Sequence, residues 1–138
     1  MSYQIEKKLY LPCQASKANP KALGDWSENF ACKWLKSQGL TIIDRNFHSK
    51  YGEIDLIMKA DDCLIFIEVR YRKNTDFGSA EASITDKKCQ RLIATAQYYL
   101  LKKKYGINTA IRFDAIAISP SKESDLHCTL NWIKNILS

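Results

Sequence analysis

Three charged residues stand inside the most apolar part of the sequence, the stretch GEIDLIMKADDCLIFIEVRYR at residues 52–72. Asp55, Glu68 and Arg70 lie there among Ile, Leu, Met, Phe and Val, where an unpaired charge is costly. Such residues need either partners or a ligand. In one interpretation they form buried salt bridges, with Arg70 and Arg45 as the cations. In the other, the two carboxylates bind a metal ion.

The stretch reads as two antiparallel strands joined by a short polar turn, and this hairpin brings the two carboxylates together. If Met58 pairs with Cys63, Asp55 lies diagonal to Glu68. If the pairing shifts by two residues, Asp55 lies directly opposite Glu68. In both registers the carboxylates share a face, with about 5–8 Å between their Cβ atoms.

Side-chain alternation predicts which faces these residues occupy. The first strand places Ile54 with Leu56 on one face and Asp55 on the other. On the second strand one face reads Leu64, Phe66, Glu68, Arg70 and Arg72 in order, apolar at first and then charged. This pattern is typical of a central strand that is buried on both sides and emerges into a cleft at one end.

Two carboxylates this close repel each other, and each tends to take up a proton. A bound divalent cation removes the conflict. A few hard oxygen ligands with room for water suit Mg²⁺ or Mn²⁺ better than Zn²⁺. Glu28, at the margin of the buried stripe of the first helix, either faces the same cleft or is a solvated helix residue. The metal interpretation therefore predicts Glu28, Asp55 and Glu68 as ligands.

Periodicity predicts the elements that position these residues. Apolar residues at helical spacing begin at Leu23, and Gly39 ends that helix. We expect a second helix over residues 85–104, strands over 40–47, 53–58, 64–72 and 109–119, and a short strand or turn over 128–137. The order αβββαβ(β) predicts an α/β fold, with a mixed sheet flanked by helices, over residues 22–138. Residues 1–21 are polar and are predicted to form an irregular arm.

The net charge of +6 on 138 residues is localised. Residues 70–104 hold nine Lys and Arg against three acids, and the remainder of the chain carries 12 of each sign. A localised surface that binds anions is one interpretation, and a solvated, solubilising helix is the other.

Composition excludes several classes of protein. Apolar residues make up 46% and charged residues 26%, as in an ordinary globular domain. No apolar run approaches the roughly 18 residues that span a membrane, and no secretory signal precedes the domain. The five cysteines are scattered and form no C-x-x-C pair, which argues against both a zinc site and a disulfide framework. We therefore expect a cytoplasmic protein with no membrane partner.

The motifs GEIDLI, FIEVRYR, TDKK and RFDAI together resemble the YraN family. These small bacterial proteins are related to the PD-(D/E)XK nucleases and to archaeal-type Holliday junction resolvases. The resemblance implies a restriction-endonuclease-like αβββαβ core. It also implies Mg²⁺ held by Asp55, by Glu68 and by the backbone carbonyl of Val69, with help from Glu28. By analogy with junction resolvases, it implies a homodimer that cuts two strands.

The sequence departs from the nuclease signature at two positions. Ile54 stands where the signature has Pro, a common and harmless change. Arg70 stands where the catalytic Lys is expected, and an arginine stays protonated and cannot act as a base. Arg70 can still stabilise charge that builds on a phosphate. Lys88, near the start of the second long helix, either takes over the missing role or is a solvated lysine.

The implied function is metal-assisted hydrolysis of phosphodiester bonds, with nucleic acid, and DNA in particular, as the partner. The catalytic residues would be Asp55, Glu68, Arg70 and Lys88, and those that bind nucleic acid would be Arg72, Lys87, Lys88, Gln90 and Arg91. Tyr98 and Tyr99 are the only aromatic candidates in the basic segment. The alternatives are a nucleic-acid-binding module that has lost cleavage and a scaffold whose charges form a buried ion-pair network.

Overall fold

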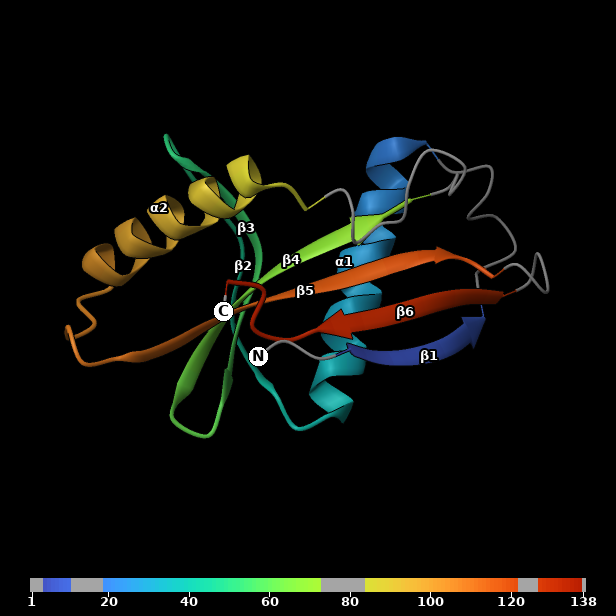
Figure 1. Cartoon of the computed structure of the whole chain (residues 1–138), viewed down its shortest axis with the longest axis horizontal. Coiled ribbons are helices and arrows are strands. Elements are labelled where there is room, and N and C mark those ends of the chain that lie inside the picture. The colour runs from blue at the N-terminus through green and yellow to red at the C-terminus, as the bar shows by residue number, and fades with distance from the viewer. Residues whose placement is uncertain (1–3, 11–18, 73–83, 122–126, 138) are drawn as a thin grey trace.

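A computed structural model of the chain describes residues 4–10, 19–72, 84–121 and 127–137, with only the backbone described for residues 4–10 (Figure 1). The strands are β1 (Gln4–Tyr10), β2 (Thr41–Ser49), β3 (Gly52–Ala60), β4 (Cys63–Tyr71), β5 (Ala110–Pro120) and β6 (His127–Ile133). The helices are α1 (Pro20–Ser37) and α2 (Asp86–Lys102). From α1 onward the order is αβββαβ followed by a last strand, as predicted.

The strands form one mixed sheet in the order β1-β6-β5-β4-β3-β2. Strands β4 and β5 are parallel and every other neighbouring pair is antiparallel. Helix α2 joins the parallel pair, because a parallel connection needs a crossover. The fold is therefore the predicted restriction-endonuclease-like α/β fold.

The prediction of an irregular arm over residues 1–21 was wrong for Gln4–Tyr10. These residues form β1, which pairs along its whole length with β6, from Gln4 opposite Ile133 to Tyr10 opposite His127. The physical reason is the open edge of β6, whose free backbone groups offer a template for another strand. Pro20 and Lys21, also assigned to the arm, are the first residues of α1.

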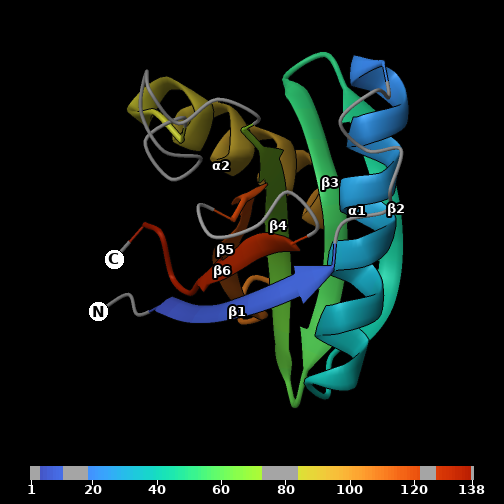
Figure 2. The ribbon, with the colours of Figure 1, turned by 90° about the vertical axis from the view of Figure 1, so that its right-hand side faces the viewer.

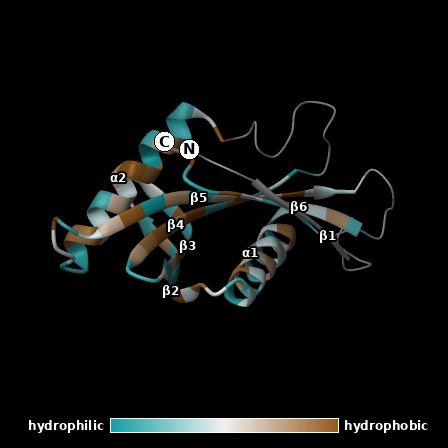
Figure 3. Ribbon diagram, turned by 60° about the horizontal axis from the view of Figure 1, so that its bottom comes forward, coloured by the Kyte–Doolittle hydropathy of each residue, from teal (hydrophilic) through white to brown (hydrophobic). Residues whose placement is uncertain are grey.

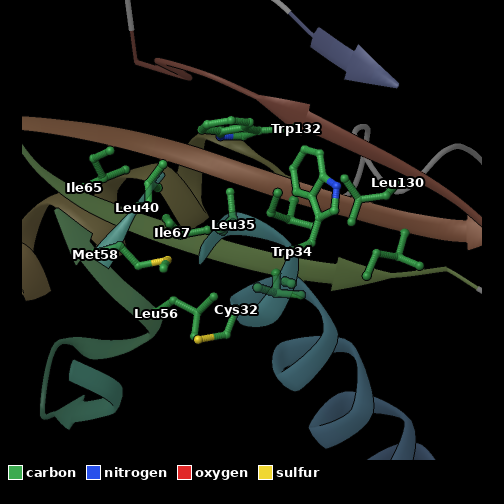
Figure 4. Packing of buried hydrophobic residues seen from close by; sticks show 14 of the residues in the cluster. Cys32, Trp34, Leu35, Leu40, Leu56, Met58, Ile65, Ile67, Leu130 and Trp132 are labelled. Carbon is green, nitrogen blue, oxygen red and sulfur yellow. The ribbon is translucent and has the colours of Figure 1, made fainter. Parts of the chain in front are cut away.

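The two helices lie on opposite faces of the sheet (Figure 2). One core cluster joins Ala31, Cys32, Trp34 and Leu35 of α1 to inward residues of β3–β6, among them Leu56, Met58, Ile65, Ile67 and Trp132. Within it, the rings of Trp34 and Trp132 meet edge to face at 5.6 Å (Figure 4). The second cluster joins Leu92, Ala96 and Tyr99 of α2 to Ile54, Ile57, Leu64, Phe66 and Phe113.

Local signals fix where the helices begin and end. The Asn19 side chain accepts a hydrogen bond from the backbone N–H of Ala22 at 2.8 Å, and Pro20 follows as the first helical residue. Gly39, with φ of +99°, ends α1 as predicted. Thr85 caps α2 by accepting from the Lys88 N–H at 3.3 Å. Each helix mixes polar and apolar residues, so each covers the sheet with one face and presents the other to solvent (Figure 3).

Asp114 of β5 is fully buried, and hydrogen bonds satisfy its carboxylate. Its carboxylate accepts two bonds from the Arg112 guanidinium, at 2.9 Å each, and one from Trp132 Nε1 at 3.0 Å. The backbone N–H of Asn135 adds a fourth bond at 2.9 Å. This carboxylate therefore ties β5 to β6 and to the residues that follow β6.

Among the described residues, no helix is long and apolar enough to cross a membrane, as predicted.

Free thiols are found at four described cysteines, as expected for scattered cysteines: Cys32, Cys63, Cys89 and Cys128. Cys13 lies outside the described residues.

Gly52, where β3 begins, packs closely against α2 and has φ of +147°. A Cβ added there would lie 3.1 Å from Thr95 Oγ1 and 3.6 Å from Arg91 Cβ. We expect Gly52→Ala to lower the free energy of unfolding by about 1–2 kcal/mol, because the backbone is strained and the hairpin is pushed off the helix. Urea unfolding measures this. The control is Gly106→Ala, where an added Cβ meets nothing within 4 Å. Equal stability of both variants would contradict the prediction.

Candidate functional site

The candidate site lies where β3 and β4 separate. Their backbone pairing runs from Ala60 opposite Cys63 to Leu56 opposite Ile67 and then stops (Figure 1). This is the second of the two predicted registers, and its next pair would be Asp55 and Glu68. The two carboxylates therefore stand at the fork of the diverging strands, where backbone groups no longer pair with each other.

The Asp55 side chain accepts a hydrogen bond from a backbone N–H of β4 that no longer pairs with β3. Its Oδ2 accepts a hydrogen bond from the Val69 N–H at 2.8 Å. The prediction that Ile54 shares a face with Leu56 was wrong. Ile54 packs in the α2 cluster, whereas Leu56 packs in the α1 cluster. Next to the fork, the side chains of β3 do not alternate strictly between the two faces of the sheet. Asp55 therefore faces the cavity beneath α1.

Glu68 is almost buried, with 8% of the residue exposed. The Arg70 Nε lies 3.0 Å from Glu68 Oε1, which is the ion pair expected in the salt-bridge interpretation. The geometry is not that of a hydrogen bond, because this Nε has no hydrogen-bond partner among the described residues. The Arg70 side chain is also 32% exposed and keeps contact with solvent. The ion pair therefore compensates Glu68 only in part.

Burial raises the pKa of both carboxyls at the fork. Burial followed by the charge of Asp55 raises the pKa of Glu68 from 4.5 to about 8, against the lowering effect of Arg70. Burial also raises the pKa of Asp55, and the hydrogen bond from Val69 opposes this by favouring the charged form. Both carboxyls line the cavity beneath α1, so each affects the pKa of the other. Without a cation the pair therefore holds one proton near neutral pH, mainly on Glu68.

The Glu28 carboxyl of α1 also interacts electrostatically with Asp55. It is half-buried, and burial followed by the charge of Asp55 raises its pKa from 4.5 to about 7, while Arg45 lowers it. Arg45 was one of the two candidate cations for buried salt bridges with Asp55 and Glu68, but its Nη2 lies 2.7 Å from Asn29 Oδ1 on α1. Glu28 lines the cavity beneath α1 together with Asp55 and Glu68, so it faces the cleft between helix and sheet.

Two cavities open on either side of the fork. The one beneath α1 has a volume of about 340 Å³ and is lined by residues that include Glu28, Glu53, Asp55, Glu68 and Arg70. The one beneath α2 has a volume of about 390 Å³ and is lined by His48, Ser49, Gly52, Glu53, Glu68, Arg70, Lys88, Arg91 and Leu92. They share Glu53, Glu68 and Arg70. One side of the site is therefore acidic and the other is rich in cations.

The basic residues predicted on α2 divide into two groups. Lys88 and Arg91, about one turn apart, line the cavity with Glu68. Lys87 and Gln90 are exposed outside its lining, and so is Arg72 after the end of β4. The structure thus brings Lys88 to the position suggested for it and leaves the other three on the surface.

Sequence reasoning missed the contribution of the turn between β2 and β3. His48 and Ser49 line the α2-side cavity, and His48 Nδ1 lies 3.1 Å from Glu53 Oε2. Tyr51 contacts Tyr98 of α2, with 5.8 Å between ring centroids. The tight turn SKYG, which places a tyrosine where glycine and polar residues are usual, is the sequence signal that could have indicated this.

The side chains at the fork suit a hard divalent ion with few protein ligands. Over the described residues, no three His, Cys, Asp or Glu side chains gather closely enough to form a metal-binding group. Asp55 and Glu68 offer two carboxylates, and Glu28 stands across the cavity. Mg²⁺ is commonly held by one or two carboxylates together with water and substrate phosphate. The two carboxylates of Asp55 and Glu68 fit such an ion, whereas Glu28 lines the same cavity without forming a group of three with them.

Comparison with known proteins gives a consistent result. The family model described as "Uncharacterised protein family UPF0102" matches residues 27–118. The UPF0102 protein of Aliivibrio fischeri strain MJ11 is 41% identical over 122 residues, which cover 88% of this chain and 95% of the relative. The UPF0102 protein of Nitrosococcus oceani is 43% identical over 112 residues, which cover 81% of this chain and 88% of the relative.

Proposed function

Because this chain belongs to the uncharacterised protein family UPF0102, the YraN family that its motifs resemble, its activity must be inferred from the site, and we propose a metal-dependent nuclease-like function. The protein would bind nucleic acid, with DNA as the favoured partner and branched DNA as one substrate, and hydrolyse phosphodiester bonds. The observation that carries the proposal is the placement of Asp55 and Glu68 at the fork of β3 and β4, where both line the α1-side cavity.

Mg²⁺ or Mn²⁺ bound there would lower the pKa of a coordinated water and neutralise charge on the phosphate. Asp55 and Glu68 would hold the ion, and the Val69 N–H bond at 2.8 Å fixes the orientation of Asp55. Glu28 lines the same cavity and would add negative charge near the ion. The proton that the free pair shares would leave as the ion binds, so binding would strengthen as the pH rises.

Arg70 and Lys88 would act on the phosphate. Arg70 is partly exposed at the cavity mouth, so its guanidinium can contact an anion while it remains near Glu68. An arginine cannot remove a proton from water, so its role would be to stabilise the charge of the transition state. Lys88 and Arg91 would bind phosphates in the α2-side cavity, and Lys87, Gln90 and Arg72 would add surface contacts.

A cleavage panel tests this proposal. Linear duplex, flap, four-way-junction and single-stranded DNA, together with RNA, are incubated with Mg²⁺, Mn²⁺ or EDTA. We expect cutting that requires metal, and we expect it to disappear in the Asp55→Asn/Glu68→Gln double variant, because that variant loses both ligands. The matched control is Asp62→Asn, an exposed acid in the β3–β4 turn, which should cut normally. Cutting in EDTA, or equal cutting by the double variant, would refute the proposal.

The ion pair between Arg70 and Glu68 favours a second candidate, a nucleic-acid-binding module without cleavage. An arginine already paired with the metal-binding carboxylate could hold phosphate and still fail to support chemistry. Retained binding without cutting in any metal would identify this module. Arg70→Lys supplies the direct comparison, since it restores the residue of the nuclease signature. Cutting gained only in that variant would show that the arginine alone blocks catalysis.

We further propose that the protein acts in the cytoplasm, in keeping with its free cysteines.

A homodimer would present two sites to the two strands of a branched substrate. Sedimentation with and without a four-way junction tests this, and a complex that contains a single copy would contradict it.

A further inference from the structure

Three aromatic rings form a surface feature beside the α2-side cavity, here termed the aromatic ridge: Phe47, Tyr51 and Tyr98. Tyr98 lies between the other two, with ring centroids 5.8 Å from Tyr51 and 6.1 Å from Phe47. Tyr51 is 44% exposed, whereas Tyr99, the next residue along α2, is 2% exposed and belongs to the core. Tyr51 therefore presents ring surface to solvent, whereas Phe47 packs against the α2 core cluster and anchors the ridge to it.

Lysine side chains accompany these rings. The Lys50 ammonium lies 5.2 Å from the centroid of Tyr51. The Lys102 ammonium lies 5.9 Å from the centroids of both Phe47 and Tyr98. A nucleotide combines a flat base with an anionic phosphate, and a surface that alternates rings with ammonium groups complements both parts.

The ridge continues into the candidate site. Tyr98 follows Arg91 by two helical turns, so both lie on the same side of α2. Tyr51 lies between Ser49 and Gly52, which line the α2-side cavity. The close packing of Gly52 against Thr95 and Arg91 holds the turn against the helix. A bound chain could therefore run from the cations of the cavity onto the rings without leaving the surface.

We propose that the aromatic ridge binds the unpaired bases of a single-stranded segment whose phosphates lie along Lys88 and Arg91. This rests on the proposed nucleic-acid function and names its substrate class. Bases in a duplex stack on each other and offer no free face, whereas unpaired bases stack on aromatic side chains. The substrate would therefore carry a single strand next to the bond that is cut, as a flap, an open junction or a frayed end does.

Equilibrium binding in EDTA tests the inference without cleavage. A fluorescent single-stranded oligonucleotide is compared, by anisotropy, with a blunt duplex of the same length. We expect wild-type protein to prefer the single strand. Tyr51→Ala and Tyr98→Leu should each weaken single-strand binding by about tenfold and leave duplex binding unchanged. Tyr51→Phe should bind as wild type does, because it keeps the ring. The matched control is Tyr105→Ala, a comparably exposed tyrosine outside the ridge.

Salt dependence separates stacking from charge. Tyr51→Ala should weaken binding at every salt concentration without changing the slope of log affinity against log salt. Lys88→Ala and Arg91→Ala should each reduce that slope by about one. Normal single-strand binding by the tyrosine variants, or equal affinity for both DNA forms, would overturn the inference.

The outcomes for the ridge and for the proposed nuclease function are distinguishable. Ridge-dependent binding without cutting in any metal would support the ridge and refute catalysis. Rapid cutting of blunt duplex with unaffected tyrosine variants would do the reverse. Binding to neither DNA form would refute both.

Discussion

Asp114→Ala is expected to lower the free energy of unfolding by about 3–5 kcal/mol, because it removes a buried charge that accepts hydrogen bonds from three residues. The carboxylate is completely buried and accepts four hydrogen bonds. Its loss would remove the acceptor that Trp132 Nε1–H and the Asn135 N–H have in Asp114. The Arg112 side chain is 27% exposed, so water can partly solvate its charge, and this limits the cost.

Urea unfolding measures the change. Asp62→Ala, an exposed aspartate in the β3–β4 turn, is the matched control and should change the stability by no more than about 0.5 kcal/mol. Asp114→Asn should fall between the two, since the amide oxygen can still accept some of the bonds. A stability for Asp114→Ala close to that of the control would show that the hydrogen bonds of Asp114 make no net contribution to the free energy of unfolding.

Asp114 also shows what the sequence could not predict. The motif RFDAI places an acid in an apolar strand, just as GEIDLI places Asp55, and local sequence does not distinguish them. The distinction comes from Trp132 and Asn135, which follow Asp114 by 18 and 21 residues and reach it only through the β5–β6 pairing. The Asp114 carboxylate is satisfied by hydrogen-bond donors, whereas the Asp55 carboxylate shares a cavity with that of Glu68.

The elements themselves were predictable where periodicity is local. The stripe of α1, the start of α2 near Thr85 and the central strands follow from spacing and turn chemistry within a few residues. Strand β1 was missed because Lys7 and Lys8 interrupt its apolar pattern and its partner β6 lies at the other end of the chain. The contact between Tyr51 and Tyr98 was missed for the same reason, since only tertiary packing brings the turn to α2.

Glu68→Gln is expected to stabilise the metal-free protein at alkaline pH, by roughly 2–4 kcal/mol. The pKa of Glu68 is raised from 4.5 to about 8 in the fold, so the folded state holds its proton more tightly than the unfolded state. Below pH 4.5 both states are protonated, and titration costs no stability. As the pH rises from about 4.5 to about 8, only the unfolded chain ionises, and the wild-type protein loses stability. Glutamine cannot ionise and avoids this loss.

Unfolding in EDTA at pH 5 and pH 8.5 checks the prediction. The variant and wild type should be similar at pH 5 and should diverge at pH 8.5, and the exposed-site control Asp62→Asn should follow wild type at both. Glu28 and Asp55 shift in the same direction but are present in both proteins. Adding Mg²⁺ at pH 8.5 should stabilise wild type and leave Glu68→Gln unchanged, because only wild type keeps both carboxylate ligands.

The sign of the stability change in Glu68→Gln distinguishes a functional site from a scaffold. In a scaffold, Glu68 would be the charged partner of Arg70, and glutamine would lower stability at every pH above the ordinary pKa of a glutamate, because a partly buried arginine would lose its counter-charge. In a cation site, the fold tolerates two carboxyls that repel each other, and its stability recovers when either a metal ion or an amide removes the repulsion. Asp114 and Glu68 are both buried acids of the same sheet, so opposite signs for their neutral variants would assign one to the fold and the other to the chemistry.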